Sequence, residues 1–327
     1  MPALITLSIH PSQFPWQVHE DLRKSLVLRE VNHKFLYDSH KQTQKWLELH
    51  QVLSPSRTDP DCAACYDAAF AAVAERVRAP AIHLIGLGCG GGQKDARLLG
   101  LLQEKVPQRF YTPVDVSTAM VLTAHQVASS LASESHPFVC DLSSADDLAP
   151  FLARQAPAET LKVITFFGMI PNFEPQLMLP KIAEMLWAKD LLLLSANLAP
   201  GADYAAGVRQ ILPLYDNAPT NDWLLTFLLD LGVEKSDGAL EWTIEACPSG
   251  SDLLRVEGCF RFEHSRSLRI AQEEFKFWPG EKIRLFFSYR YTPERILKHL
   301  SGHGLRVHQQ WISDSGEEGV FLCGRTG

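Results

Sequence analysis

The chain has 327 residues, of which 46% are hydrophobic, which is enough for one large domain or two small ones. Its formal net charge of −7 and the lack of any Lys/Arg run argue against nucleic-acid binding, which normally needs a basic face. No apolar run approaches the roughly 20 residues that span a bilayer, and the N-terminus lacks the basic start and apolar core of a signal peptide. We therefore expect a cytoplasmic protein with neither membrane nor nucleic acid among its partners.

Residues 15–60 predict polar, partly amphipathic helices that end in the turn-rich stretch SPSRTDP at 54–60. Beyond this stretch, helical patterns alternate with short apolar runs. Strands are predicted at 81–87, 109–116, 136–142, 161–168 and 190–197, and helices at about 66–78, 93–104, 117–132 and from the fourth strand to about 187. This alternation is typical of right-handed βαβ units in a parallel sheet.

The character of the sequence changes after Pro200. Residues 200–235 look helical, and residues 240–291 show the period-2 alternation of antiparallel strands. Thr292 then opens a helix that ends near Gly302, and a terminal β-hairpin suits the edge of the first sheet. The expected fold is α/β, with a Rossmann-like sheet in 61–199 plus 288–327. A second, α+β domain that binds substrate would comprise 1–60 plus 200–287.

The cysteines and histidines predict neither disulfides nor a metal site. The seven cysteines are odd in number and scattered, and the Cys62-x-x-Cys65 motif lies in an alanine-rich helical stretch without the second pair of a zinc knuckle. His299 and His303 are four residues apart, but glycines bracket the second histidine and no third ligand is near. A G-x-S-x-G nucleophile elbow is also lacking.

A glycine-rich loop lies between the first predicted strand and the helix that follows it. Five of the seven residues from Gly86 to Gly92 are glycine, and Gly86, Gly88 and Gly91 have the G-x-G-x-x-G spacing of a nucleotide-binding loop. Glycine is costly in ordered structure unless a ligand or another backbone must come close. The loop therefore predicts a ligand beside the main chain, and a tight turn without a ligand is the alternative.

Two aspartates sharpen this prediction. Asp115 ends the second strand, where a carboxylate meets ribose hydroxyls, and Asp141 ends the third, where it can accept a hydrogen bond from an adenine amino group. Each alone is more often a helix cap. Together they favour S-adenosylmethionine over NAD, since a dinucleotide enzyme has no fixed need for the second acid. An NAD-dependent oxidoreductase would also need a second nucleotide-binding half, whereas this chain turns antiparallel after 240.

The chain resembles the family of histidine-specific S-adenosylmethionine methyltransferases, the ergothioneine-pathway enzymes that trimethylate an α-amino group. The family also includes fungal dimethylallyltryptophan N-methyltransferases. The resemblance runs from about residue 30 to the C-terminus and rests on the order and spacing of KFLYD (34–38), SPSR (54–57), LGCGGGQKDARLL (87–99), YTPVDVS (111–117), CDL (140–142), FFGMIPNFEP (166–175), LYDN (214–217), GEKIRLFFSYRYTPE (280–294) and GLRVHQQWISDSGEEGVFL (304–322).

The resemblance implies S-adenosylmethionine as cofactor and a set of residues for each part of the site. For the cofactor these are Gly88, Gly90 and Lys94 at the methionine end, Asp115 at the ribose, and Asp141 with Leu142 at the adenine. For the substrate's carboxylate and amine they are Tyr37, Asn172, Tyr215 and Ser288, with Tyr37 and Asn172 orienting the amine as catalytic residues. The alternative interpretations are a core position for either tyrosine, a loop cap for the asparagine and a solvated hydroxyl for the serine.

Three departures from the family pattern qualify the expected substrate. Phe286 stands where the histidine enzymes have an acid, and Ser54 where they have a tyrosine, so both imidazole contacts are lost. Gly86 replaces the acid usual at the first position of the loop. We expect an N-methyltransferase that acts on the α-amino group of an amino acid or analogue, other than histidine, with an apolar or aromatic side chain. The alternatives are a histidine Nα-methyltransferase, an NAD-binding oxidoreductase and an inactive cofactor-binding protein. A nucleic-acid N-methyltransferase is disfavoured by the acidic charge.

Overall fold

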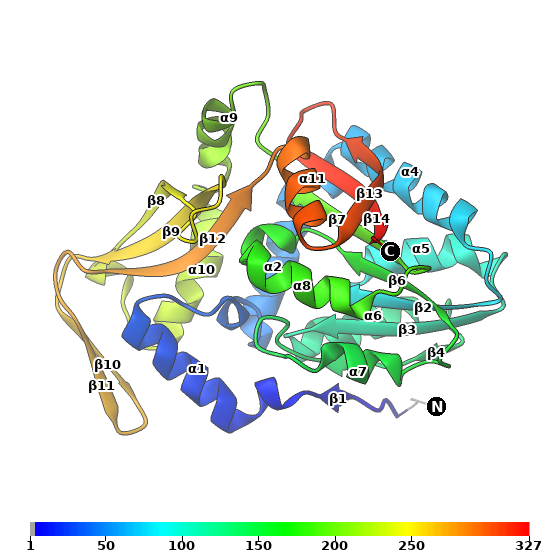
Figure 1. Cartoon of the computed structure of the whole chain (residues 1–327). Coiled ribbons are helices and arrows are strands. Elements are labelled where there is room, and N and C mark those ends of the chain that lie inside the picture. The colour runs from blue at the N-terminus through cyan, green and yellow to red at the C-terminus, as the bar shows by residue number, and fades with distance from the viewer. Residues whose placement is uncertain (1–3, 327) are drawn as a thin grey trace.

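A twisted sheet of mostly parallel strands forms the centre of the molecule (Figure 1). In the computed structural model, which describes residues 4–326, the strand order is β1-β5-β3-β2-β6-β7-β14-β13, and β4 pairs with β3. These strands are β1 (Ser8–Ile9), β2 (Ala81–Leu87), β3 (Gln108–Asp115), β4 (Glu134–Ser135), β5 (Phe138–Val139), β6 (Leu161–Phe166), β7 (Leu191–Asn197), β13 (Leu305–Ile312) and β14 (Glu318–Arg325). The terminal hairpin joins the sheet through antiparallel pairing of β14 with β7, as the sequence predicts.

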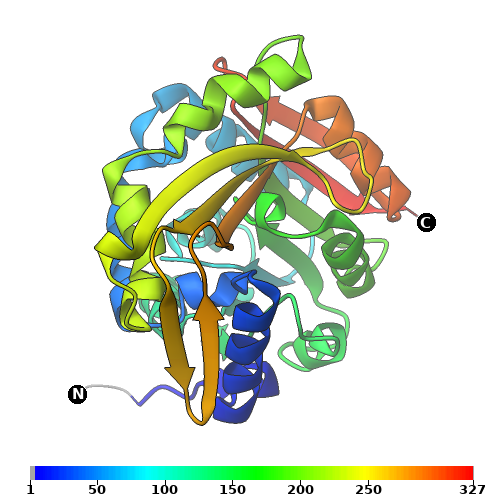
Figure 2. The same cartoon turned by 90° about the vertical axis from the view of Figure 1, so that its left-hand side faces the viewer.

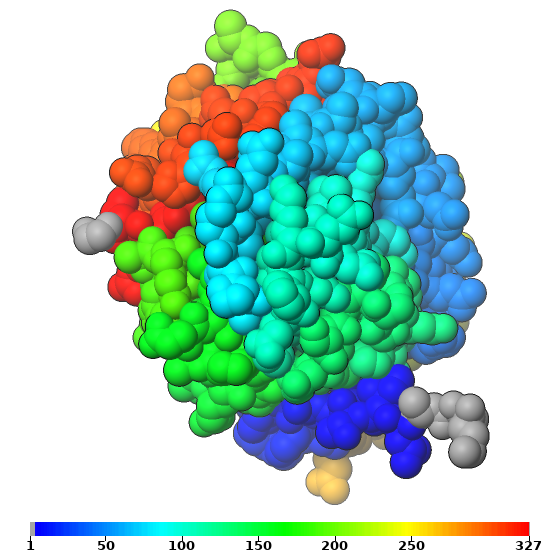
Figure 3. Space-filling view, turned by 90° about the vertical axis from the view of Figure 1, so that its right-hand side faces the viewer, coloured from blue at the N-terminus to red at the C-terminus, as the bar shows by residue number. Residues whose placement is uncertain are grey.

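Helices cover both faces of this sheet, which explains why its central strands are apolar runs without alternation. Two helices, α4 (Pro60–Arg76) and α5 (Gln93–Gln103), pack on one face of the sheet, and α6 (Thr118–Ala128) lies beside α5. Three helices pack on the other face: α7 (Leu148–Ala153), α8 (Pro175–Met185) and α11 (Pro293–Gly302). Figure 3 shows the face on which α4 and α5, light blue and cyan, lie at the surface. The expected α/β fold with a Rossmann-like sheet is confirmed.

The second part of the molecule lies over the carboxyl ends of the parallel strands (Figures 1 and 2). It has a three-stranded antiparallel sheet in the order β12-β9-β8, and a β10–β11 hairpin that extends beside α1. Its elements are β8 (Gly238–Ala246), β9 (Leu254–Phe262), β10 (Arg266–Ile270), β11 (Glu273–Phe277), β12 (Lys282–Arg290), α1 (Pro15–Leu28), α2 (His40–Leu53), α3 (Pro55–Thr58), α9 (Tyr204–Ile211) and α10 (Ala218–Asp230). Short 3₁₀ turns lie at η1 (Pro11–Gln13), η2 (His33–Leu36), η3 (Ile170–Asn172), η4 (Leu212–Leu214) and η5 (Lys235–Asp237).

The structure differs from the sequence-based expectation at several boundaries. β1 pairs in parallel with β5 in the large sheet, although residues 1–60 were assigned to the other domain. β12 continues unbroken through the expected boundary at residue 288. α4 begins at Pro60 rather than near 66, because Asp59 caps it and proline fits the first helical position. The predicted strand at 136–142 shortens to Phe138–Val139. No helix within residues 4–326 is long and apolar enough to cross a membrane.

Candidate active site

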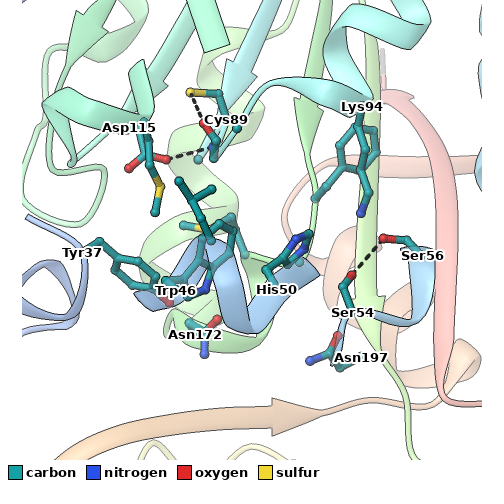
Figure 4. A pocket seen from close by; sticks show the side chains of 18 of the residues that line it. Tyr37, Trp46, His50, Ser54, Ser56, Cys89, Lys94, Asp115, Asn172 and Asn197 are labelled. Carbon is teal, nitrogen blue, oxygen red and sulfur yellow. Dashed lines mark hydrogen bonds between the residues drawn. The ribbon is translucent and has the colours of Figure 1, made fainter. Parts of the chain in front are cut away.

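A cavity of about 560 Å³ lies at the carboxyl ends of the parallel strands, where the second part of the molecule meets the sheet. It opens at the end of β2, which pairs with β3 on one side and β6 on the other, so the strand order reverses there. Ligands of open α/β sheets bind at this kind of switch point. The walls come from both parts: η2, α2, the glycine loop, η3 and β12 all contribute (Figure 4).

The glycine loop adopts the backbone shape that its composition predicts. Gly88 and Gly90 have positive φ angles of +64° and +51°, which favour glycine. A Cβ on Gly88 would stand 2.6 Å from Cγ of Met169, so a larger residue does not fit there without a shift of Met169. The backbone N–H of Gly90 donates to Oδ2 of Asp115 over 3.1 Å, which ties the loop to the end of β3. The loop, from Gly88 to Gly91, lines the cavity.

The two predicted aspartates both line the cavity and both hold a turn. Asp115 is buried and accepts backbone hydrogen bonds from Gly90 and Ser117. Burial raises its pKa to about 6, against the lowering effect of those bonds. Asp141 accepts from the backbone N–H of Ser143 and the hydroxyls of Ser143 and Ser144. Both aspartates therefore stabilise a turn and also line the cavity, and the adjacent Leu142 lines it as well.

Lys94 brings an unpaired positive charge to the wall of the cavity. It follows the glycine loop in the first turn of α5, and its Nζ lies 3.9 Å from the ring centre of Tyr66 and 5.5 Å from that of Phe167. Among the described residues no carboxylate lies within ion-pairing distance of this ammonium. Burial lowers its pKa, so an anion placed beside it would restore the favourable environment. A carboxylate such as that of a methionine moiety fits this position.

Tyr37, which directly follows η2, and Asn172, the last residue of η3, both line the cavity (Figure 4). The Tyr37 ring packs between Trp46 and Trp223, at centroid distances of 5.8 and 5.4 Å. Burial raises its pKa well above the ordinary value, so the phenol stays protonated at neutral pH. Asn172 donates from Nδ2 to the carbonyl oxygen of Phe287 over 2.8 Å, which orients its Oδ1 as an acceptor without a partner in the described part of the chain.

Tyr215 links a serine to an arginine that our sequence analysis did not single out. Its hydroxyl donates to Ser288 Oγ over 2.9 Å and accepts from Arg290 Nη2 over 2.7 Å. Ser288 is 1% exposed and lies behind Tyr215 rather than at the wall. Arg290 does line the cavity, although it is only 7% exposed. The one available signal was its position two residues after Ser288 on the same face of a strand.

The Arg290 guanidinium has no acidic partner. No carboxylate of residues 4–326 forms an ion pair with it, and its Nε is buried without a hydrogen-bond acceptor. Its remaining contacts are neutral: Nη1 donates to the carbonyl oxygen of Leu198, and the group lies 5.1 Å from the ring centre of Tyr215. A buried, unpaired charge is unfavourable unless a ligand of opposite charge completes it.

Aromatic rings surround Phe286 at the cavity wall. Its ring centre lies between 5.9 and 6.2 Å from those of His33, Tyr215, Trp223 and Trp242. Ser54 lies at the junction of α2 and α3, where its Oγ is 3.0 Å from that of Ser56. Our sequence analysis also did not single out His33, whose ring centre lies 5.9 Å from that of Phe286. Burial lowers its pKa to about 4, so its ring is neutral at pH 7.

The strand–glycine loop–helix at the switch point, with a buried acid at the end of the next strand and an unpaired lysine beside it, defines a Rossmann-like protein with an adenosine-cofactor site of the methyltransferase type. The chain belongs to the family described as histidine-specific methyltransferase, SAM-dependent, whose model matches residues 18–325. This confirms the expected family and its cofactor, S-adenosylmethionine. The roles of the individual site residues stay predictions.

Two curated relatives and one solved structure illustrate the similarity. The N-methyltransferase imqF of Aspergillus flavus is 24% identical over 247 residues, a match that covers 72% of this chain and 66% of the fungal protein. The histidine N-alpha-methyltransferase of Mycolicibacterium smegmatis is 25% identical over 74% of this chain and 75% of the relative. A structure of the Burkholderia thailandensis 1,6-didemethyltoxoflavin-N1-methyltransferase is 11% identical with a TM-score of 0.46, over 100% of this chain and 94% of that chain.

Proposed function

We propose that the protein transfers a methyl group from S-adenosylmethionine to the α-amino group of an amino acid, or a close analogue, with an apolar or aromatic side chain. The observation that carries this proposal is the buried, unpaired guanidinium of Arg290 next to Tyr215. Arginine recognises carboxylates with two parallel N–H donors, and only two of the five N–H groups of Arg290, one on each Nη, have an acceptor within residues 4–326. A simple amine would leave this charge without a partner.

The amine of such a substrate would lie near Asn172. The free Oδ1 of this residue accepts a hydrogen bond from an N–H and so orients the nitrogen lone pair. When bound, S-adenosylmethionine supplies a methyl group on a sulfonium, and displacement needs the lone pair in line at about 3 Å. Tyr37 stays protonated, so it can position the amine but does not take its proton, which leaves to water.

The substrate's side chain would meet the aromatic wall around Phe286. Most polar atoms of this wall are already paired, since Nε1 of Trp223 and Nε1 of Trp242 donate hydrogen bonds within the chain. A strongly polar group placed there would lose its hydration with only His33 Nε2, which is buried without a partner in residues 4–326, to bond to, at a cost of about 1–3 kcal/mol for each unmade hydrogen bond. This supports a phenyl, phenol or indole side chain over imidazole. Histidine is the second candidate, because one relative is a histidine N-alpha-methyltransferase.

Mass spectrometry after incubation with S-adenosylmethionine and matched substrates tests the proposal. The panel contains phenylalanine, tyrosine, tryptophan and histidine, each alongside the corresponding decarboxylated amine. We expect methyl additions on the aromatic amino acids and little on the amines. Methylation of the amines at equal rates would contradict the carboxylate requirement, and exclusive methylation of histidine would favour the second candidate.

A further inference from the structure

Gly86 and Asp95 share one space at the end of β2. Gly86 is the second-to-last residue of β2, directly before the glycine loop, and its φ angle is not positive. A Cβ built there would lie 3.1 Å from Cγ of Asp95 and closer still to its Oδ2. The carboxylate of Asp95 therefore occupies the volume that a side chain at position 86 would fill. Glycine is required at 86 because of this neighbour rather than because of its φ angle.

Asp95 is held in this place by neutral donors from two strands. The Tyr111 hydroxyl on β3 donates to Oδ2 over 2.9 Å, and the Thr165 hydroxyl on β6 donates to Oδ1 over 2.7 Å. Asp95 is only 3% exposed, and it lies on the cavity wall. No basic side chain in residues 4–326 forms an ion pair with it. Each oxygen thus has one donor and retains a further lone-pair direction.

The charge of Asp95 is poorly compensated. Burial raises its pKa to about 6, although the Thr165 and Tyr111 hydrogen bonds and the charge of Lys94 act to lower it. A cation brought to the cavity wall would favour the ionised form. Lys94, the preceding residue of α5, presents an unpaired cation on the same cavity. Lys94 and Asp95, adjacent residues in the first turn of α5, therefore place opposite charges at the cavity wall.

We propose that Asp95 supplies, from helix α5, the carboxylate that the glycine loop lacks at Gly86, and that it attracts the ammonium group at the amino-acid end of the cofactor. Lys94 then faces the carboxylate of the same amino-acid end. The proposal depends on the family's cofactor, S-adenosylmethionine, and is independent of which substrate is methylated. According to the proposal, an acidic side chain at position 86 or at position 95 would serve the same function.

The test compares two ligands on four variants by isothermal titration calorimetry. S-adenosylhomocysteine carries the amino-acid end, and 5′-methylthioadenosine shares the adenosine but lacks that end. Asp95→Asn should weaken S-adenosylhomocysteine by at least about tenfold and leave 5′-methylthioadenosine within about twofold, because only the first ligand carries the ammonium group. A purely structural Asp95 would weaken both ligands equally or neither, which would overturn the proposal.

A swap provides the second arm. Gly86→Asp alone places two carboxylates in contact and should lower the melting temperature and weaken S-adenosylhomocysteine. The double variant Gly86→Asp, Asp95→Ala removes that conflict and should recover affinity to within about threefold of the original protein. Tyr111→Phe is the matched control, since it removes one donor to Asp95 and leaves the carboxylate in place. If the double variant is folded but binds no better than Asp95→Asn, the two positions do not carry the same function. If the unaltered protein binds neither ligand, the cofactor assignment itself fails, which is a distinct result.

Discussion

The hydroxyl of Tyr215 receives a 2.7 Å hydrogen bond from Arg290 and passes one of 2.9 Å to Ser288. This chain of bonds fixes a buried guanidinium at the cavity wall without neutralising it. A buried charge of this kind is stabilised by an anion beside it. The substrate carboxylate proposed above is such an anion, which gives the proposed function a direct test.

Arg290→Met should raise KM for an aromatic amino acid by at least about tenfold and leave the decarboxylated amine unaffected, because only the acid forms a charged hydrogen bond with the guanidinium. Arg284→Met is the matched control. It changes the same strand, but Arg284 already pairs with Glu30 and Glu257 outside the cavity. Steady-state kinetics with both substrates provides the measurement. An equal loss on acid and amine would argue for a structural role.

Ser288→Ala should have a smaller effect than Tyr215→Phe on KM for the amino acid. Ser288 acts through Tyr215, whereas the Tyr215 hydroxyl touches Arg290 itself. We expect a change of about twofold to fivefold for the serine variant, the scale of one neutral hydrogen bond. If Ser288→Ala is as damaging as Tyr215→Phe while the melting temperature is unchanged, the serine contacts substrate directly, as the family resemblance implies.

Cofactor binding should weaken as the pH falls through about 6. Burial raises the pKa of both Asp115 and Asp95 to about 6, from an ordinary value of 3.8. Ribose hydroxyls and an ammonium group both favour ionised carboxylates, so we expect binding to be strongest above this pH and to weaken progressively below it. Tyr37 and Cys89, which face Asp115, stay neutral throughout because burial raises their pKa values. Titration with S-adenosylhomocysteine at about pH 7.5, 6.5 and 5.5 measures the effect.

The same two carboxyls act in the opposite direction on the stability of the protein without cofactor. Their pKa values are raised in the folded state, so the folded protein takes up protons at a higher pH than the unfolded chain does. Their contribution to the free energy of unfolding therefore rises as the pH falls from about 6 towards 4. Three histidines, His33, His50 and His83, act the other way, because burial lowers their pKa values to about 4, 3 and 3 and the unfolded chain takes up their protons first. We therefore expect the net stability to fall over this range, so binding is compared only at pH values at which the melting temperature without cofactor shows a folded protein.

The elements that the sequence predicts best are those with a strong periodic pattern. The strand before Gly86, the helix after it and the acid at the end of β3 all follow from local residue order. Asp95 and Arg290 do not. Asp95 crowds Gly86 only because α5 packs on β2. The lack of an acidic partner for Arg290 becomes apparent only when the three-dimensional positions of the acidic residues are known. β1, with two residues, is too short for any periodicity to reveal.

Asn172→Asp should separate binding from turnover. A carboxylate in place of the amide attracts the substrate's ammonium form, which lowers KM but raises the pKa of the amine. Since only the neutral amine reacts, kcat should fall at pH 7 by about tenfold and recover as the pH rises towards 9. The variant also loses the hydrogen bond to Phe287, so its melting temperature is recorded as a control. A pH-independent loss of kcat would show that Asn172 does not contact the amine.

The substrate end of the cavity should change specificity when the two departures from the family pattern are reversed. The double variant Phe286→Glu, Ser54→Tyr provides an acid and a phenol for an imidazole ring and disrupts the aromatic wall around Phe286. We expect activity on histidine to rise, and activity on an aromatic amino acid to fall, by at least about tenfold each, because buried polar groups reject a side chain that leaves them unpaired. A competition assay with both amino acids measures the ratio directly, and Ser56→Tyr, which changes a neighbouring lining residue instead of Ser54, is the control. If the double variant binds S-adenosylhomocysteine normally but its substrate ratio does not move, Phe286 and Ser54 do not contact the substrate's side chain, and other residues select it.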